Sequence, residues 1–227
     1  SRLLEAKTDS GVTLLLLDCP AFFQRPGSAY LDADGNDFSD NYLRFGLLSK
    51  TAALLSSEAS PLRWRPDVLH CNDWPCGMAP AYLRFMGGAK AATVMSIHNL
   101  AFQGIFPAGT LIPLGLPPEA FAMDGVEYWG KLSFMKAGLH YADRITTVSP
   151  RYAEEIQTEA FGYGFAGLLR WRRNDLAGIL NGIDTTEWDP ATDRHLPARY
   201  DVQHLAGKTQ CKLALQAELG LPVDEHV

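Results

Sequence analysis

The chain has 227 residues, 47% hydrophobic and 20% charged, a balance typical of globular proteins and unlike that of disordered chains. Its 26 acidic and 20 basic residues give a net charge of −6, which disfavours nucleic-acid binding, because tracking a phosphate backbone needs a basic excess. No apolar segment approaches the roughly 20 residues that span a bilayer, so no membrane partner is expected.

Apolar segments alternate with amphipathic ones along the chain. Residues 11–18 (GVTLLLLD) predict a buried strand, because they form an apolar run bounded by turn residues. Further strands are expected at 68–71, 92–97, 144–148 and 176–180. Helices are expected at 39–57, 74–86, 131–142, after Ser149-Pro150, at 167–173 and at 208–219. Residues 20–37 and 100–129 are expected to be loops, the second long enough to be functional or to carry short helices.

Strands that alternate with helices predict the α/β class, with a Rossmann-like, doubly wound parallel sheet. Ligands bind beyond the carboxyl ends of the strands in such sheets. Asp73, His98 and Asn181 each follow an expected strand, which is a physical reason to treat them as one candidate site.

Each candidate residue has a functional and a structural interpretation. His98 and Asn99 could hydrogen-bond sugar hydroxyls, or could cap the loose carbonyls of the strand. Asp73 precedes Trp74, so the acid could accept sugar hydroxyls while the indole packs on the sugar; the alternative is a helix N-cap. Tyr30 could stack on a sugar from its loop, or could be an ordinary, partly buried tyrosine.

Other chemistries have weaker support. His70, Asp73 and His98 have the spacing of no familiar metal motif, so no metal is expected. The glycine-rich stretch 161–167 (FGYGFAG) follows no clear strand and could bend around a ligand or form a tight packing turn. No dinucleotide-binding G-x-G-x-x-G fingerprint is expected, which disfavours a nicotinamide-binding site. A serine hydrolase elbow is missing from the sequence. The four cysteines are too sparse for a disulfide scaffold and favour the reduced thiols of a cytoplasmic protein.

Seven segments together resemble the bacterial glycogen synthases and plant starch synthases, which are retaining glucosyltransferases of the GT-B fold. Most specific are IHNLAFQG (97–104), KAGLHYADRITTVSP (136–150) and LNGID (180–184). The others are RPGSAY (25–30), DNYLRF (40–45), RPDVLHCNDW (65–74) and FGYGFAGLL (161–169). They keep the order and spacing of the family over nearly the whole chain.

The resemblance implies transfer of glucose from ADP-glucose to the non-reducing end of an α-1,4-glucan, with retention of configuration and without a cofactor. It implies catalytic roles for His98, Asp73 and Asn181. It implies sugar-binding roles for Tyr30, Asn99, Gln103 and Gly104. His98 would contact the donor glucose near its C6 hydroxyl, and Asn181 would also hold that sugar.

The resemblance also implies a division of the chain. Residues 1–180 would be most of the N-terminal Rossmann-like domain, and 181–227 a linker and the start of a C-terminal domain. The family's K-T-G-G loop would precede Ser1, and the C-terminal half would supply the groups that bind the diphosphate. The fragment alone is therefore expected to be inactive. A GT-B enzyme that uses a UDP-sugar and a non-catalytic glucan-binding module remain alternatives.

Overall fold

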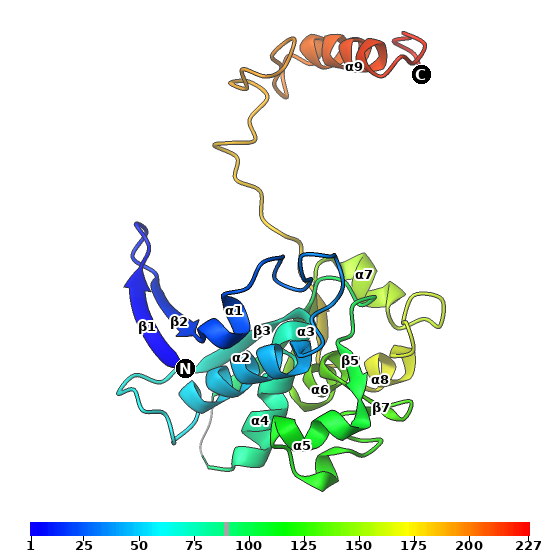
Figure 1. The fold of residues 1–227 in the computed structure, drawn as a ribbon. Helices are drawn as coiled ribbons and strands as arrows, with labels where there is room; N and C mark the ends of the chain where they lie inside the picture. The colour runs from blue at the N-terminus through cyan, green and yellow to red at the C-terminus, as the bar shows by residue number, and fades with distance from the viewer. Residues whose placement is uncertain (89–90) are drawn as a thin grey trace. The chain divides into compact units, whose positions relative to one another are not determined.

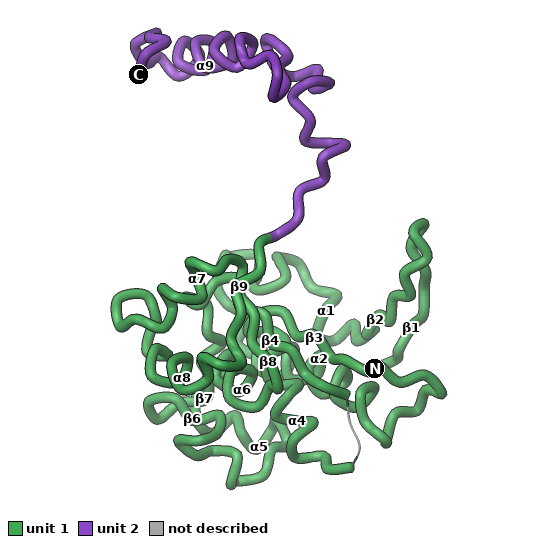
Figure 2. Tube along the Cα trace, turned by 180° about the vertical axis from the view of Figure 1, so that it is seen from behind, with its two compact units in different colours: residues 1–180 green, residues 181–227 purple. Residues whose placement is uncertain are grey.

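The computed structural model describes residues 1–88 and 91–227 and divides into two compact units, Ser1–Leu180 and Asn181–Val227 (Figure 2). Unit 1 contains a four-stranded sheet of order β3–β4–β8–β9, whose strands are all labelled in Figure 2 and whose first strand, β3, is also labelled in Figure 1. The strands are Val68–Asn72, Ala92–Ile97, Arg144–Thr147 and Leu176–Gly178. Every neighbouring pair in this sheet is parallel. The predicted α/β class with a Rossmann-like parallel sheet is confirmed.

The helices between these strands share one buried cluster. The helices are α3 (Asp73–Cys76), α4 (Met78–Met86), α6 (Phe134–Tyr141), α7 (Pro150–Glu155) and α8 (Ala166–Trp171). Strand order follows sequence order, so right-handed crossovers place the helices on the same face of the sheet. Cys71, Met95 and Ile145, aligned across three strands, are buried on that face with side chains from α4, α6 and α8.

A second cluster lies beneath the longest helix of unit 1, α2 (Asn41–Leu55). Its members include Phe45 and Ala53 from α2, Leu83 from α4 and Phe134 from α6. The predicted helix 39–57 is therefore present and is two residues shorter at each end. Asp40 occupies the N-cap position, but its side chain makes no capping hydrogen bond and instead pairs with an arginine.

The expectation of a buried strand at 11–18 is wrong. The strand itself forms, as β2 (Thr13–Asp18), but it pairs antiparallel with β1 (Arg2–Lys7) in a separate two-stranded sheet. Leu14 and Leu16 are exposed there. A short apolar run between turn residues is consistent with a strand but does not say whether another layer covers it.

The expected loop 100–129 contains several short elements. β5 (Ile105–Pro107), β7 (Lys131–Ser133) and β6 (Glu127–Tyr128) form an antiparallel sheet in that order, with α5 (Leu111–Leu114) and two 3-10 turns, Ala108–Thr110 and Pro118–Ala120, between them. The helix expected at 131–142 begins only at Phe134. Residues before it belong to β7, and Ser133 Oγ accepts from the Lys136 N–H as the N-cap.

Two further helices lie outside the sheet. α1 (Pro20–Phe23) is a single turn, and α9 (Ala206–Glu218) is the helix of unit 2, in the region where a helix was expected at 208–219. None of the helices in the described part of the chain is both long and apolar enough to cross a bilayer.

Candidate functional site

Asp73 joins the ends of two parallel strands. It follows β3 directly, and its Oδ1 accepts hydrogen bonds from the backbone N–H groups of His98 (2.9 Å) and Asn99 (3.5 Å), which follow β4. The N-cap interpretation of Asp73 is wrong, because Asn72 occupies the N-cap position of α3 and Asp73 is the first helical residue. The carboxylate thus fixes the loop that carries His98.

The backbone of Asp73 is strained. Its φ of 55° lies in the left-handed region, which only two other non-glycine residues adopt in the described chain, Trp129 and Tyr163. Aspartate tolerates this conformation better than most residues, at a cost on the order of 1 kcal/mol. Strained residues of this kind cluster at functional sites, where the surrounding structure holds them in place.

A cleft of about 550 Å³ opens beside Asp73. Its lining combines aromatic and polar residues with a leucine and a proline: Ser28, Tyr30, Leu31, Asp37, Asp73, Trp74, Pro75, Asn99 and Phe102. Tyr30 is 44% exposed, and its ring lies 5.9 Å from the Trp74 ring, centroid to centroid. Faces of aromatic rings beside carboxylate and amide oxygens suit a sugar, whose C–H faces are apolar and whose rim is hydroxylated.

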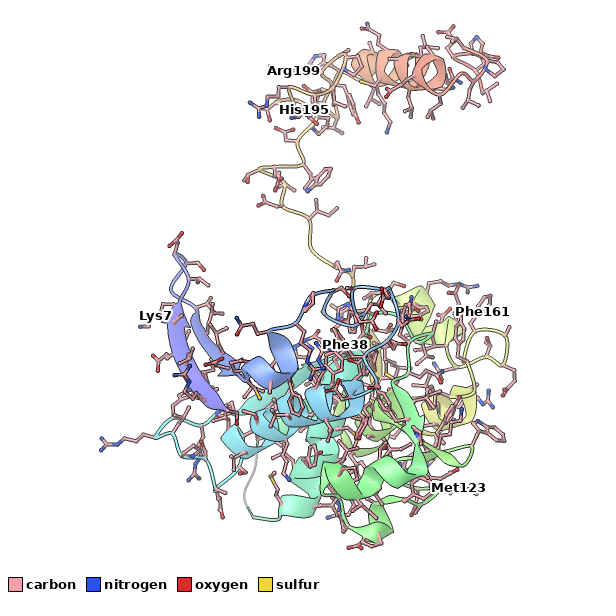
Figure 3. The ribbon with its side chains drawn as sticks, viewed as in Figure 1. Lys7, Phe38, Met123, Phe161, His195 and Arg199 are labelled. Atoms are coloured by element: carbon pink, nitrogen blue, oxygen red, sulfur yellow. The ribbon has the colours of Figure 1, made fainter. Side chains whose placement is uncertain are left out.

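The loop that carries Tyr30 is fixed by two arginines. Arg25 makes a bidentate ion pair with Asp40 at 2.9 and 2.7 Å. Arg44, buried in α2, donates to the Phe22 carbonyl, and its guanidinium lies 4.4 Å from the centre of the Phe38 ring. Phe38 extends from the loop toward α2 (Figure 3). Tyr30 is thus presented by an anchored loop.

His98 is exposed, and its ring is held by a residue that sequence reasoning did not single out. His98 Nε2 lies 2.9 Å from Oδ1 of Asn72, the last residue of β3. The position of Asn72, immediately before Asp73 at the end of the same strand, could have indicated its proximity to His98. Phe102, which is 63% exposed and lines the cleft, was also missed.

Gln103 and Gly104 both make hydrogen bonds that stabilise the structure around the cleft. Gln103 Nε2 donates to the carbonyl of Tyr163 (2.8 Å), and the Phe134 N–H at the start of α6 donates to the Gly104 carbonyl. A β-carbon on Gly104, at φ 56°, would collide with the ring of Trp74. Both residues also line a second hollow, of about 460 Å³, that shares Asp37, Trp74 and Phe102 with the first. Their sugar-binding role stays a prediction.

Asn181 belongs to the other unit, of which it is the first residue. It is exposed and belongs to none of the described helices or strands. Its catalytic role stays a prediction, as do those of His98 and Asp73.

The site offers neither an ionised thiol nor a metal-binding cluster in the residues that are described. Burial raises the pKa of Cys71 to about 12, and burial also raises the pKa of Cys76, so both thiols on either side of Asp73 are protonated at neutral pH. No group of three or more His, Cys, Asp or Glu residues that could hold a metal ion occurs outside residues 89–90.

The glycine-rich stretch lies in a different context from a nucleotide-binding fingerprint. Gly162, Gly164 and Gly167 have the G-x-G-x-x-G spacing, but α7 precedes them where the fingerprint needs a strand. Tyr163 adopts a φ of 45°, and the Tyr128 hydroxyl also donates to its carbonyl. The stretch is therefore a packed turn next to Gln103.

Comparison with known proteins places this chain in a family. The family model of the starch synthase catalytic domain matches residues 2–171, about three quarters of the chain. The chain therefore belongs to the starch synthase catalytic domain family, and the resemblance seen in the sequence is confirmed.

Named relatives make the comparison more specific. The glycogen synthase of Aromatoleum aromaticum is 58% identical over 99% of this chain and 46% of its own length. That of Nitrosomonas europaea is 55% identical over 99% of this chain and 45% of its own. The catalytic domain of starch synthase IV from Arabidopsis thaliana, solved with ADP and acarbose bound, aligns with a TM-score of 0.72 at 29% identity, over 97% of this chain and 45% of that one. The chain spans less than half the length of these relatives.

Proposed function

We propose that this chain is the acceptor-side part of a glycogen synthase, which transfers glucose from ADP-glucose to the 4-hydroxyl at the non-reducing end of an α-1,4-glucan with retention of configuration. The observation that carries the proposal is the 53–58% identity to glycogen synthases over nearly the whole chain. Family membership and the aromatic-polar cleft beside Asp73 support it. The corresponding cellular location is the cytoplasm.

The roles proposed for individual residues follow from what each can offer a sugar. Tyr30 provides a ring face at the cleft, and the Asn99 amide provides hydrogen bonds. Asp73 orients the loop after β4 and has a second carboxylate oxygen for a hydroxyl. His98 and Asn181 would hold the donor glucose. Gln103 and Gly104 would complete the wall next to the donor.

We propose that the other half of the reaction machinery lies in the part of the relatives that this chain does not span. Charge develops on the leaving diphosphate during transfer, and basic groups must stabilise it. Residues 1–180 would form the N-terminal domain, and 181–227 would begin the connection to the second domain. Closure of two domains would exclude water and protect the donor from hydrolysis.

Transfer assays test the proposal. The 227-residue chain and a chain extended to the full length of its relatives are each incubated with glycogen and radiolabelled ADP-glucose or UDP-glucose. We expect incorporation only by the extended chain, only from ADP-glucose, and a loss of at least about 100-fold with His98→Ala. His226→Ala, a change at an exposed histidine of unit 2, is the matched control.

Each other outcome leads to a different conclusion. Incorporation from UDP-glucose alone would support the proposed transferase activity and show that its donor is UDP-glucose. Glycogen binding without incorporation from either donor would show that the protein is a glucan-binding module and not an enzyme. Turnover by the 227-residue chain would disprove the need for a second half.

A further inference from the structure

Asn72 is placed where an asparagine normally caps a helix, but it does something else. Its φ of −112° and ψ of 116° are those of an N-cap residue of α3, a position at which an asparagine side chain usually accepts from a backbone N–H of the first turn. The Asn72 side chain makes no capping hydrogen bond. Its Oδ1 lies instead 2.9 Å from Nε2 of His98.

This contact determines which ring nitrogen of His98 carries the proton. A carboxamide oxygen can only accept, so Nε2 must be the donor in the neutral imidazole. The proton is then absent from Nδ1, which keeps a lone pair. Within residues 1–88 and 91–227, no hydrogen bond to Nδ1 is formed. Such a contact is the usual way in which a protein selects a histidine tautomer.

We infer that Asn72 is a positioning residue that holds His98 as the Nε2–H tautomer, so that Nδ1 is an acceptor for a sugar hydroxyl. The first half of this inference stands on geometry alone, and the second half rests on the proposed function. A hydroxyl that binds Nδ1 must donate its proton there, because Nδ1 has none to give. The other tautomer would present an N–H to the same hydroxyl and reverse the direction of the hydrogen bond.

A neighbouring histidine provides an internal comparison. His70 lies two residues before Asn72 on β3, and its Nε2 is 2.6 Å from Oγ of Ser96 on β4. A serine hydroxyl can donate or accept, so Ser96 does not impose a tautomer as an amide oxygen does. β3 and the segment directly after β4 thus hold two histidines. Of the two, only His98 has a partner atom that can accept but not donate a hydrogen bond.

The tautomer is measured directly in the 227-residue chain. Two-bond 1H–15N spectra of 15N-histidine-labelled protein at about pH 8.5, where an ordinary imidazole of pKa about 6.5 is neutral, distinguish protonated from unprotonated ring nitrogens. His98→Gln assigns the His98 signals. We expect widely separated shifts with Nε2 protonated, a clearly smaller separation in Asn72→Leu, and the native pattern in Asn72→Asp, which keeps an acceptor oxygen.

Three results would overturn the inference: protonation at Nδ1 in the native chain, an unchanged pattern in Asn72→Leu, or an equal response of His98 to Ser96→Ala. The third would show that the strand end as a whole orders His98. Ser96→Ala is expected to move the signals of His70 only. Amide spectra of each variant establish that it is folded, so that an altered His98 pattern reports on the ring and not on unfolding.

Transfer assays of the extended chain test the second half of the inference. Asn72→Leu should lower kcat about 10- to 100-fold with little change in KM for glycogen, and Asn72→Asp should recover most of that loss. Equal kcat values for Asn72→Leu and native enzyme would rule out a role of the tautomer in transfer. If the extended native enzyme transfers nothing, the proposed function fails, while the spectra still decide the role of Asn72.

Discussion

Single residues at this strand edge serve more than one requirement at once. Asp73 must supply an acceptor for two N–H groups and must also adopt a positive φ. Aspartate and asparagine satisfy both conditions, because each has a short side chain with an acceptor oxygen and tolerates the left-handed region. Alanine satisfies neither, and glycine satisfies only the second.

This difference predicts a stability order. Asp73→Ala should lower the free energy of unfolding by about 1–3 kcal/mol, because it leaves the N–H groups of His98 and Asn99 without their acceptor and adds backbone strain. Asp73→Asn should cost less, since it keeps an oxygen in the same place. Urea unfolding of the two variants provides the measurement. Equal losses would mean that the carboxylate, and not the acceptor geometry, stabilises the loop.

At the scale of elements, one arginine closes the end of α6. Arg172, just beyond α8, is 8% exposed. Its guanidinium donates to the carbonyls of Leu139 and His140 in the last turn of α6 and to that of Ala142, the C-cap residue. It also pairs with Asp175 at 2.9 Å. These are the carbonyls that a helix leaves without partners at its C-terminus, where a cation is also favoured by the helix dipole.

We therefore expect Arg172→Met to destabilise unit 1 strongly, by about 3–5 kcal/mol, because the carbonyls at the end of α6 lose their donor and Asp175 keeps only one of its two arginine partners, Arg144. Arg173→Met is the matched control, since Arg173 is adjacent and exposed. The comparison is made by thermal and urea unfolding. A loss of similar size in both variants would show that the effect comes from net charge and not from the closure of α6.

The ion pair between the Tyr30 loop and α2 predicts a pH dependence. The Arg25 guanidinium holds the pKa of Asp40 below its usual range, mainly through their hydrogen bonds. A lowered pKa in the folded state adds stability above pH about 4, the pKa of an unfolded aspartate, and that stability is lost as the pH falls through the lower, folded-state pKa.

Unfolding in urea at pH 6, 4 and 3 tests this dependence. The native chain should be more stable than Asp40→Asn at pH 6, and the difference should shrink at pH 3. Asp9→Asn, a change in the exposed β1–β2 turn, should show no such convergence. A difference between native and Asp40→Asn that stays constant with pH would contradict the assignment.

At the scale of the whole chain, the buried residues all belong to unit 1. Both hydrophobic clusters are built from residues between Phe45 and Leu169, and α9 contributes no buried side chain. Residues 1–180 alone should therefore unfold cooperatively, with a midpoint within about 3 °C of that of the full chain. Differential scanning calorimetry of both proteins is the measurement, and a non-cooperative transition of the shorter one would contradict it.

The sequence predicts local structure here better than it predicts contacts. The four strands of the parallel sheet and α2 were expected at nearly their observed positions, because strand and helix periodicity is local. The exposure of β2 depends on which other elements pack against it, and the residues 11–18 carry no information about those elements. The hydrogen bonds from the His98 N–H to Asp73 and from Gln103 to the Tyr163 carbonyl join residues 25 and 60 positions apart, so only the fold reveals them.

The link between the ends of β3 and β4 has a thermodynamic consequence. Loops that become ordered around a ligand lose conformational entropy during binding, and that loss weakens the affinity. Asp73 restrains the backbone of His98 and Asn99 in the folded chain itself. A ligand that reached this edge would therefore meet a backbone that was already ordered during folding, and its contacts with these residues would add to affinity without that entropy loss.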